Sequence, residues 1–256
     1  MSHLFCFQDQ TFSLDRYPKT SNRSLLPFSN AELLVLRHLK ERDDVEHVHV
    51  FNDRFGVWNC ALHNCNLTTV WNYASQKKAV IQNLQRNRLT VDTTQFRSPL
   101  EKLHSVDVAL VKIPKSMELF ELYLRQIHQA STDETEVMCG FMTKYFSPSL
   151  LKIASKYFDN VAQSLAWKKA RLLILKKPKA LRELSLTSDF DGRLIHTIDW
   201  KGSALQQYYG VFSSGKIDIG TQYFLEGLEI QENENQIQTT RVKNRTRNHI
   251  TIFLCE

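Results

Sequence analysis

The sequence predicts an α/β domain in which a parallel sheet carries crossover helices on both faces. Short apolar strands alternate with longer helical segments along the first 180 residues, and this order favours parallel strands connected by helices. The segment 106–113, VDVALVKI, is apolar almost throughout. Such a run is typical of a strand that is buried on both faces of a parallel sheet. Pro114 then ends the strand, because proline has no N–H to donate to a neighbouring strand.

The elements before that strand show helical and strand periodicity in turn. Leucines at helical spacing predict an amphipathic helix over residues 30–42, and a short β-branched run predicts a strand over 48–51. A helix is expected over 55–62 and a second strand over 67–71. Residues 74–87 again place apolar side chains at helical spacing, so we expect another helix there.

The elements after residue 113 have recognisable helix starts. Ser116 has the side chain and position of an N-cap for a helix over 117–129. Residues 136–141 predict a strand, and the pair Ser147-Pro148 predicts the start of a helix that continues through 150–158. Beyond residue 179 the sequence is turn-rich and predicts short strands, followed by a helix that starts near 218.

Composition divides the chain into three expected parts. We expect the α/β domain over 1–180, a short β-rich segment over 181–228, and a polar tail over 229–256. The tail is rich in Asn, Gln, Thr and charged residues and has no sustained periodicity, so we expect it to be disordered.

The net charge and the cysteine content indicate which partner and which compartment to expect. The net charge of +6 and the pI of about 9.0 are compatible with a polyanionic partner such as RNA. Five irregularly spaced cysteines do not form a disulfide framework, so we expect reduced thiols and a cytoplasmic protein. We read no signal peptide and no membrane-spanning segment.

The principal candidate surface is the segment 167–179, WKKARLLILKKPK, which contains six basic residues and no acidic one. We expect its cations to contact RNA phosphates and its tryptophan to stack on a base. The candidates are Trp167, Lys168, Lys169, Arg171, Lys176, Lys177 and Lys179. An equally weighted alternative is a strand pair with ARLLIL in the core and solvated lysines at its ends.

Two further lysines and one cysteine cluster are weaker candidates. Lys112 and Lys115 flank the carboxyl end of a strand, where α/β sheets bind ligands, and could contact phosphate; a plain surface turn is the favoured alternative. The spacing of Cys60, His63 and Cys65 matches no standard zinc pattern, so we predict no metal. We assign no catalytic residue in this chain.

Four runs in this order and spacing carry a family resemblance. They are FNDRFGVWNCAL at 51–62, VALVKIPKSMELFE at 108–121, SLAWKKARLL at 164–173 and VFSSGKIDIGTQYFLEGL at 211–228. With them the chain resembles bacterial rRNA (guanine-N2) methyltransferases of the RlmG/RsmC type, and the large-subunit branch most closely. The resemblance implies two methyltransferase-fold domains in tandem, the first engaging RNA and the second binding S-adenosylmethionine and methylating a guanine of 23S rRNA.

The resemblance also implies that residues 1–180 form a degenerate Rossmann-like domain that binds no cofactor. FNDRFG has one glycine where several are needed for close approach of the backbone to the cofactor, and LTTVWN lacks the terminal acid that would bind ribose. KIPK, at 112–115, replaces the Asn-Pro-Pro-aromatic motif. Residues 181–228 would lead into a catalytic domain, and we expect the chain to be truncated before that domain's motifs.

Three functions follow as alternatives. The first is the RNA-engaging, non-catalytic part of an rRNA (guanine-N2) methyltransferase, probed by RNA binding. The second is an active S-adenosylmethionine-dependent enzyme using the first domain, which the missing motifs oppose. The third is a protein-interaction module with neither RNA nor cofactor binding, which the basic charge opposes.

Overall fold

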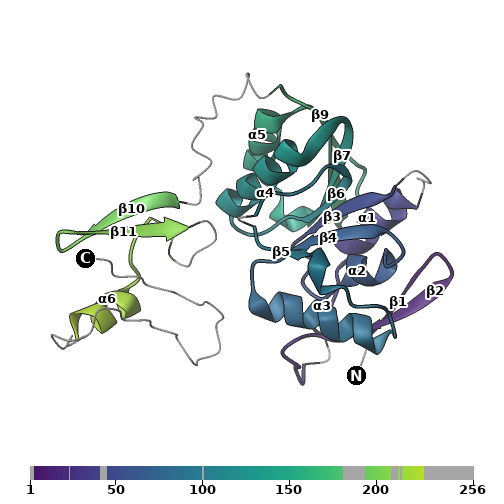
Figure 1. Cartoon of the computed structure of the whole chain (residues 1–256), viewed down its shortest axis with the longest axis horizontal. Coiled ribbons are helices and arrows are strands. Elements are labelled where there is room, and N and C mark those ends of the chain that lie inside the picture. The colour runs from purple at the N-terminus through teal and green to yellow at the C-terminus, as the bar shows by residue number, and fades with distance from the viewer. Residues whose placement is uncertain are drawn as a thin grey trace. The chain divides into compact units, whose positions relative to one another are not determined.

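A seven-stranded sheet forms the centre of the first of two compact units, which span 1–186 and 187–256 (Figure 1). The computed structural model describes residues 3–22, 24–40, 45–99, 101–180, 194–208, 213 and 215–227. The strand order is β5-β4-β3-β6-β7-β9-β8. The strands are β3 (His47–Phe51), β4 (Asn66–Val70), β5 (Phe96–Arg97), β6 (Val106–Lys112), β7 (Ser131–Met142), β8 (Phe158–Gln163) and β9 (Ala170–Pro178).

Most of the sheet is parallel, as predicted. Strands β3 to β7 pair in parallel, whereas β9 runs antiparallel to both β7 and β8. The antiparallel pair of β8 and β9 is not part of the predicted parallel sheet. It agrees with the alternative interpretation of segment 167–179 as part of a strand pair. Its direction matters for the site, because β9 starts beside the end of β7, with Ala170 opposite Met142.

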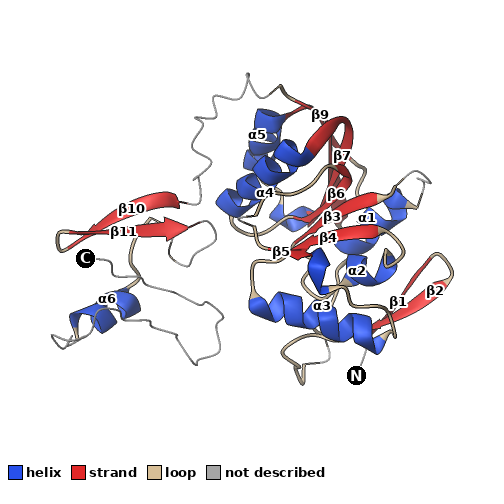
Figure 2. Ribbon diagram, viewed as in Figure 1, coloured by secondary structure: helices blue, strands red, loops and turns tan. Residues whose placement is uncertain are grey.

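Helices cover both faces of the sheet, which confirms the predicted arrangement (Figure 2). One group of elements comprises α1 (Asn30–Leu39), α2 (Val57–Ala61), α3 (Ala74–Arg86) and a hairpin of β1 (His3–Phe7) and β2 (Gln10–Leu14). The other comprises α4 (Met117–Ala130) and α5 (Pro148–Tyr157), which pack against each other and against β6 and β8. In β6, Val108 and Leu110 belong to the core shared with α1 to α3, and the buried Ala109 and Val111 alternate with them because successive strand residues face opposite sides.

The predicted helix starts are confirmed by their hydrogen bonds. Ser116 Oγ accepts the Leu119 backbone N–H at 3.1 Å, and Ser147 Oγ accepts the Ser149 N–H at 3.3 Å. Helix α1 starts where expected, and the end predicted for it at residue 42 lies outside the described residues. Each cap satisfies a backbone donor that has no partner within the helix.

Gly140 of β7 allows α1 to approach the sheet closely. A Cβ at this position would lie 2.8 Å from the Ala31 carbonyl oxygen and 3.0 Å from Val35 Cγ2. A larger residue would therefore push α1 away from the sheet.

The second unit contains a hairpin of β10 (Leu194–Trp200) and β11 (Ser203–Tyr208) and the helix α6 (Ile219–Glu226). Asp218 caps α6 by accepting the Thr221 N–H at 3.2 Å. The expected short strands and helix are thus present, whereas the tail predicted for 229–256 lies outside the described residues. Among the helices that the structure describes, none has the length and apolarity needed to cross a membrane.

Candidate functional site

The candidate site lies at the edge of the sheet where the parallel strands end, which we call the carboxyl edge. The loops after β3, β4 and β6 meet here, together with a short 3-10 turn after β7, η2 (Thr143–Tyr145). The turn between β8 and β9 lies at the same edge because β9 is antiparallel to β7. Open α/β sheets bind their ligands at this edge.

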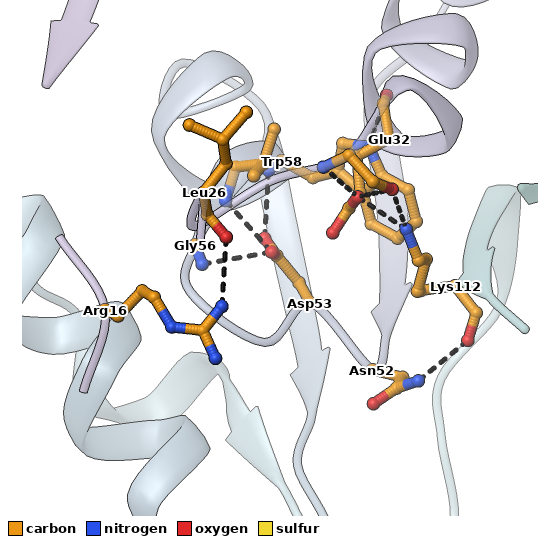
Figure 3. A network of polar contacts seen from close by, with 10 residues as sticks. Arg16, Leu26, Glu32, Asn52, Asp53, Gly56, Trp58 and Lys112 are labelled. Atoms are coloured by element: carbon orange, nitrogen blue, oxygen red, sulfur yellow. Dashed lines mark hydrogen bonds and ion pairs between the residues drawn. The ribbon is translucent and has the colours of Figure 1, made fainter. Parts of the chain in front are cut away.

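Asp53, in the loop after β3, fills the position where a ligand would meet the start of α2. Its carboxylate is fully buried and accepts the backbone N–H groups of Gly56, Val57, Trp58 and Asn59 at 2.9–3.1 Å. Figure 3 shows the hydrogen bonds from Gly56 and Trp58. The side-chain amide of Asn59 donates to the same carboxylate at 3.1 Å. Burial raises the pKa of the Asp53 carboxyl, and the hydrogen bonds from Asn59 oppose that shift. The donors at the start of α2 are therefore satisfied within the chain.

The same loop is packed closely against α3. Asn52 and Gly56 both have positive φ, 60° and 85°, so the chain turns sharply between β3 and α2. A Cβ on Gly56 would lie 3.3 Å from Val80 Cα, and Asn83 Nδ2 donates to the Phe55 carbonyl at 2.8 Å. These contacts hold α3 directly against the loop.

Just after β4, Asn72 lies near the position where a cofactor-binding domain would have an acidic residue to bind ribose. Asn72 Nδ2 hydrogen-bonds the hydroxyl of Tyr123, and the Asn72 N–H donates to Gln76 Oε1 at 3.1 Å. Tyr123 is fully buried, and its ring centroid lies 5.3 Å from that of Phe51. Burial raises the pKa of the Tyr123 hydroxyl well above its usual value. The packed rings of Tyr123 and Phe51 thus lie beside Asn72 at the carboxyl edge.

Lys112 is the last residue of β6 and Lys115 lies in the loop after it, and the two have different environments. Lys112 Nζ contacts the carboxylate of Glu32 and the hydroxyl of Ser29, and the Glu32 side chain is only 4% exposed (Figure 3). The Lys112 carbonyl also accepts a hydrogen bond from Asn52 Nδ2 at 2.9 Å. Lys112 is therefore an internal ion-pair partner, whereas Lys115 is exposed.

The structure separates the candidate segment 167–179 into two ends. Trp167, Lys168 and Lys169 lie at the carboxyl edge, whereas Lys176, Lys177 and Lys179 lie at the opposite end of β9. At about 3.3 Å per strand residue, Lys169 and Lys176 are roughly 20 Å apart. The segment is basic throughout in sequence, but it does not form one continuous surface.

At the far end two of the three lysines have acidic neighbours, whereas no ion pair joins Lys177 to another residue of the described ranges. Lys176 Nζ lies 3.1 Å from Glu136, and Lys179 Nζ lies 3.7 Å from Asp159. No ion pair joins Lys115, Lys168 or Lys169 to another residue of the described ranges. Between the two ends, Leu172, Leu173 and Leu175 are buried and Arg171 is half-buried.

Lys168 and Lys169 occupy the two central positions of a tight turn. Their φ values are 46° and 64°, and Trp167 and Ala170 exchange backbone hydrogen bonds of 2.8 and 2.9 Å. Two consecutive positive φ values identify a type I′ turn, which favours Asn-Gly. Asn30 Nδ2 donates to the Lys168 carbonyl at 2.9 Å and so anchors the turn to α1.

Trp167 lies beneath this turn and packs against the core. It is half-buried, and the cations of Lys168 and Arg37 lie 4.7 and 5.7 Å from its ring centroids. Its indole therefore lies between the core and the Lys168 side chain of the turn.

Two exposed aromatic residues at the carboxyl edge were not expected. Tyr145, the last residue of η2, and Phe146 lie shortly after β7 and are 56% and 41% exposed. The signal in the sequence was a pair of aromatic residues between a predicted strand and a predicted N-cap, a position where core residues are not needed.

The cysteine cluster consists of Cys60, His63 and Cys65, which lie close together in the sequence. No group of three His, Cys, Asp or Glu side chains in the described part of the chain is placed to hold a metal ion. Cys60 is buried, which raises the pKa of its thiol, and His63 Nδ1 lies 2.9 Å from the Cys60 carbonyl oxygen.

Comparison with known proteins identifies similar sequences. The model of the RLMG N-terminal domain family matches residues 2–180. Ribosomal RNA large subunit methyltransferase G of Psychromonas ingrahamii is 27% identical over 238 residues, which cover 89% of this chain and 60% of the relative. The protein of the same name from Yersinia enterocolitica is 28% identical over 226 residues, covering 86% and 55%. The chain thus spans little more than half the length of the curated relatives it matches.

A solved structure shares the fold. The 16S rRNA N2 G1207 methyltransferase RsmC of T. thermophilus, in complex with AdoMet and guanosine, superposes with a TM-score of 0.57 at 15% identity. The match covers 88% of this chain and 57% of that one. This likeness supports the predicted methyltransferase-type α/β fold.

Proposed function

The chain belongs to the RLMG N-terminal domain family, and from that premise we propose that residues 1–180 engage rRNA without binding a cofactor. In this proposal they serve an S-adenosylmethionine-dependent 23S rRNA (guanine-N2) methyltransferase whose cofactor binding and catalysis lie outside residues 1–180. The names of the relatives as rRNA large subunit methyltransferases support the substrate class. The partner is then rRNA and the compartment is the cytoplasm.

The loop after β3 supports the absence of cofactor binding. A cofactor cradle presents free backbone N–H groups, but here four of them donate to Asp53. Asn72 and Tyr123 fill the end of β4, and Lys112 binds Glu32 at the end of β6. The residues present at all three positions therefore do not fit S-adenosylmethionine.

The observation that carries RNA engagement is the charge at the same edge. Lys115, Lys168 and Lys169 are exposed there, and the described residues supply no ion-pair partner for them. Lysine ammonium groups that are free of acidic partners can contact phosphates and release condensed counterions. The carboxyl edge thus combines a loop whose backbone donors are already occupied with exposed lysines that can contact phosphates.

A charge-matched pair of variants tests this assignment. The edge variant carries Lys115→Gln, Lys168→Gln and Lys169→Gln, and its control carries Lys176→Gln, Lys177→Gln and Lys179→Gln at the other end of β9. With about 0.7 units of log K against log salt per single-strand phosphate, three contacts amount to about two units of slope and roughly a 50-fold affinity loss near 0.15 M salt. Binding to a 23S rRNA transcript is measured over a salt series, and the control should stay near wild type although it loses the same charge.

The alternatives give different results. If the edge variant and its control behave alike, the carboxyl edge is not the RNA surface. If the wild type binds no rRNA, a protein-interaction module becomes the better account. Micromolar binding of S-adenosylmethionine in calorimetry, lost on changing the loop after β3, would contradict the proposed absence of cofactor binding.

A further inference from the structure

We infer that Tyr145 and Phe146 form a stacking platform for unpaired RNA bases beside the Lys168–Lys169 turn. This inference rests on the proposed function and names the nucleotide feature that the carboxyl edge recognises. The two residues lie between the last parallel strand, β7, and the start of α5. Neither belongs to the predicted basic segment.

The Phe146 ring is held by its surroundings, and both rings are partly exposed. Phe146 stacks on the buried Phe141, with ring centroids 6.1 Å apart and an interplanar angle of 29°. Its N–H donates to the Thr143 carbonyl at 3.1 Å, which closes the turn that carries Tyr145. The following residue, Ser147, caps α5. The platform is therefore built on the ends of two regular elements, and the stacked Phe146 ring loses little side-chain freedom when a base binds.

A direct hydrogen bond joins this platform to the basic turn. The Thr143 N–H donates to the Lys169 carbonyl at 2.9 Å, so the turn after β7 and the β8–β9 turn form one continuous patch. Lys144 Nζ lies over one face of the Tyr145 ring, 4.8 Å from its centroid, and adds a cation beside the aromatic pair. We call Lys144, Tyr145, Phe146, Lys168 and Lys169 the edge patch.

The composition of the edge patch favours a single-stranded nucleic acid as its occupant. An exposed aromatic ring alone needs no explanation, but aromatic rings beside several cations are what single-strand binding surfaces combine. The ring faces take up bases and the lysines take up phosphates. In an A-form duplex the base faces are stacked on one another, so such a platform would gain nothing from them.

The test separates ring stacking from charge. Tyr145→Leu and Phe146→Leu remove the rings, whereas Tyr145→Phe and Phe146→Tyr retain them. Binding is followed by fluorescence anisotropy with an unstructured A-rich RNA oligonucleotide and with a duplex of the same length. Each leucine variant should bind the single strand about tenfold more weakly with an unchanged salt slope, and the ring-retaining variants should match wild type. Tyr223→Leu, which removes an exposed tyrosine of α6, serves as a control with no expected effect.

The outcomes distinguish the platform from the proposed function. If wild type does not bind the 23S rRNA transcript, or if the edge variant with glutamines shows no loss there, the proposed function fails and the platform with it. If wild type binds the transcript but not the unstructured single strand, the platform alone is refuted. If the lysine changes weaken binding but both leucine changes leave it intact, the platform alone is refuted. Equal losses on single strand and duplex would also overturn it. Thermal unfolding checks the fold of each variant, and Tyr145→Leu tests the point even if Phe146→Leu is destabilised, because the Tyr145 ring is the more exposed.

Discussion

Replacing the Lys168-Lys169 turn by Asn-Gly should make the protein more stable and weaken its RNA binding. Both lysines adopt positive φ, 46° and 64°, and neither has the glycine backbone or the short polar side chain that suits this conformation. Because the change relieves the backbone and also removes two exposed lysines, the two effects of Lys168→Asn/Lys169→Gly should have opposite signs.

The expected gain in stability follows from the two backbone conformations. The left-handed region costs an ordinary L-residue roughly 1–2 kcal/mol, which Asn relieves in part and Gly almost fully. Glycine loses about 0.5–1 kcal/mol more conformational entropy on folding. The net gain is then about 1.5 kcal/mol, which corresponds to a rise in Tm of roughly 3–6 °C for a unit of this size. Losing two single-strand phosphate contacts should weaken RNA binding roughly tenfold near 0.15 M salt.

The chain contains a matched control in the β1–β2 hairpin. Gln8 and Asp9 connect the two strands with φ values of 46° and 63°, almost the same as those of the lysine turn. Gln8→Asn/Asp9→Gly should therefore also raise Tm, though by less because the short polar side chain of Asp9 already tolerates positive φ, and should leave RNA affinity unchanged. Differential scanning calorimetry and the anisotropy assay measure both variants. If the lysine turn gains no stability while the control does, Lys168 and Lys169 are not strained; if neither gains, the argument from φ fails for this fold.

Three further changes test the internal contacts. Lys112→Met should lower the free energy of unfolding by about 3 kcal/mol, because it leaves the Glu32 carboxylate buried without its partner; a loss of RNA affinity without a loss of stability in urea would instead make Lys112 a phosphate contact. Gly140→Ala should cost about 1–3 kcal/mol by pushing Ala31 and α1 from the sheet, and an unchanged urea midpoint would contradict this packing. Burial lowers the pKa of His49 to about 4. Between about pH 6.5 and 4, His49 is therefore protonated in the unfolded chain but neutral in the native state. The free energy of unfolding should fall by about 3 kcal/mol over this range. His49→Gln should reduce that fall, and an identical pH profile for both proteins would argue against it.

The elements that the sequence predicted are those with strong local signals. The apolar run of β6, the cap at Ser116 and the Ser147-Pro148 helix start lie where expected, because hydrophobic periodicity and capping act within a few residues. The short strands after residue 179 were also expected, and their turn contains Gly202 at a φ of 85°. The β1–β2 and β8–β9 turns use Gln8-Asp9 and Lys168-Lys169 instead. They therefore lack the glycine signal that reveals a tight hairpin in sequence.

The candidate site was only partly predictable for a geometric reason. Residues 167–179 are adjacent in the chain, but a strand carries its two ends far apart, so one basic segment became two separate surfaces. The pairing of Lys112 with Glu32 joins residues from different elements and leaves no pattern in either. The loop FNDRFG could be interpreted as lacking a cradle, but that Asp53 satisfies the amides of α2 depends on the folded loop.

The carboxylate of Asp53 acts as a ligand that cannot dissociate. In a domain that holds a free cofactor, stability rises with cofactor concentration by mass action, and an empty state is always populated to some degree. Here the anion at the start of α2 is part of the chain, so its local concentration is fixed and the loop has no empty state in the native fold. If the domain binds no cofactor, as we propose, its folding is uncoupled from the supply of small molecules. The neighbouring surface need not leave an entry path open, and substitutions there can alter what the carboxyl edge binds without altering what keeps it folded.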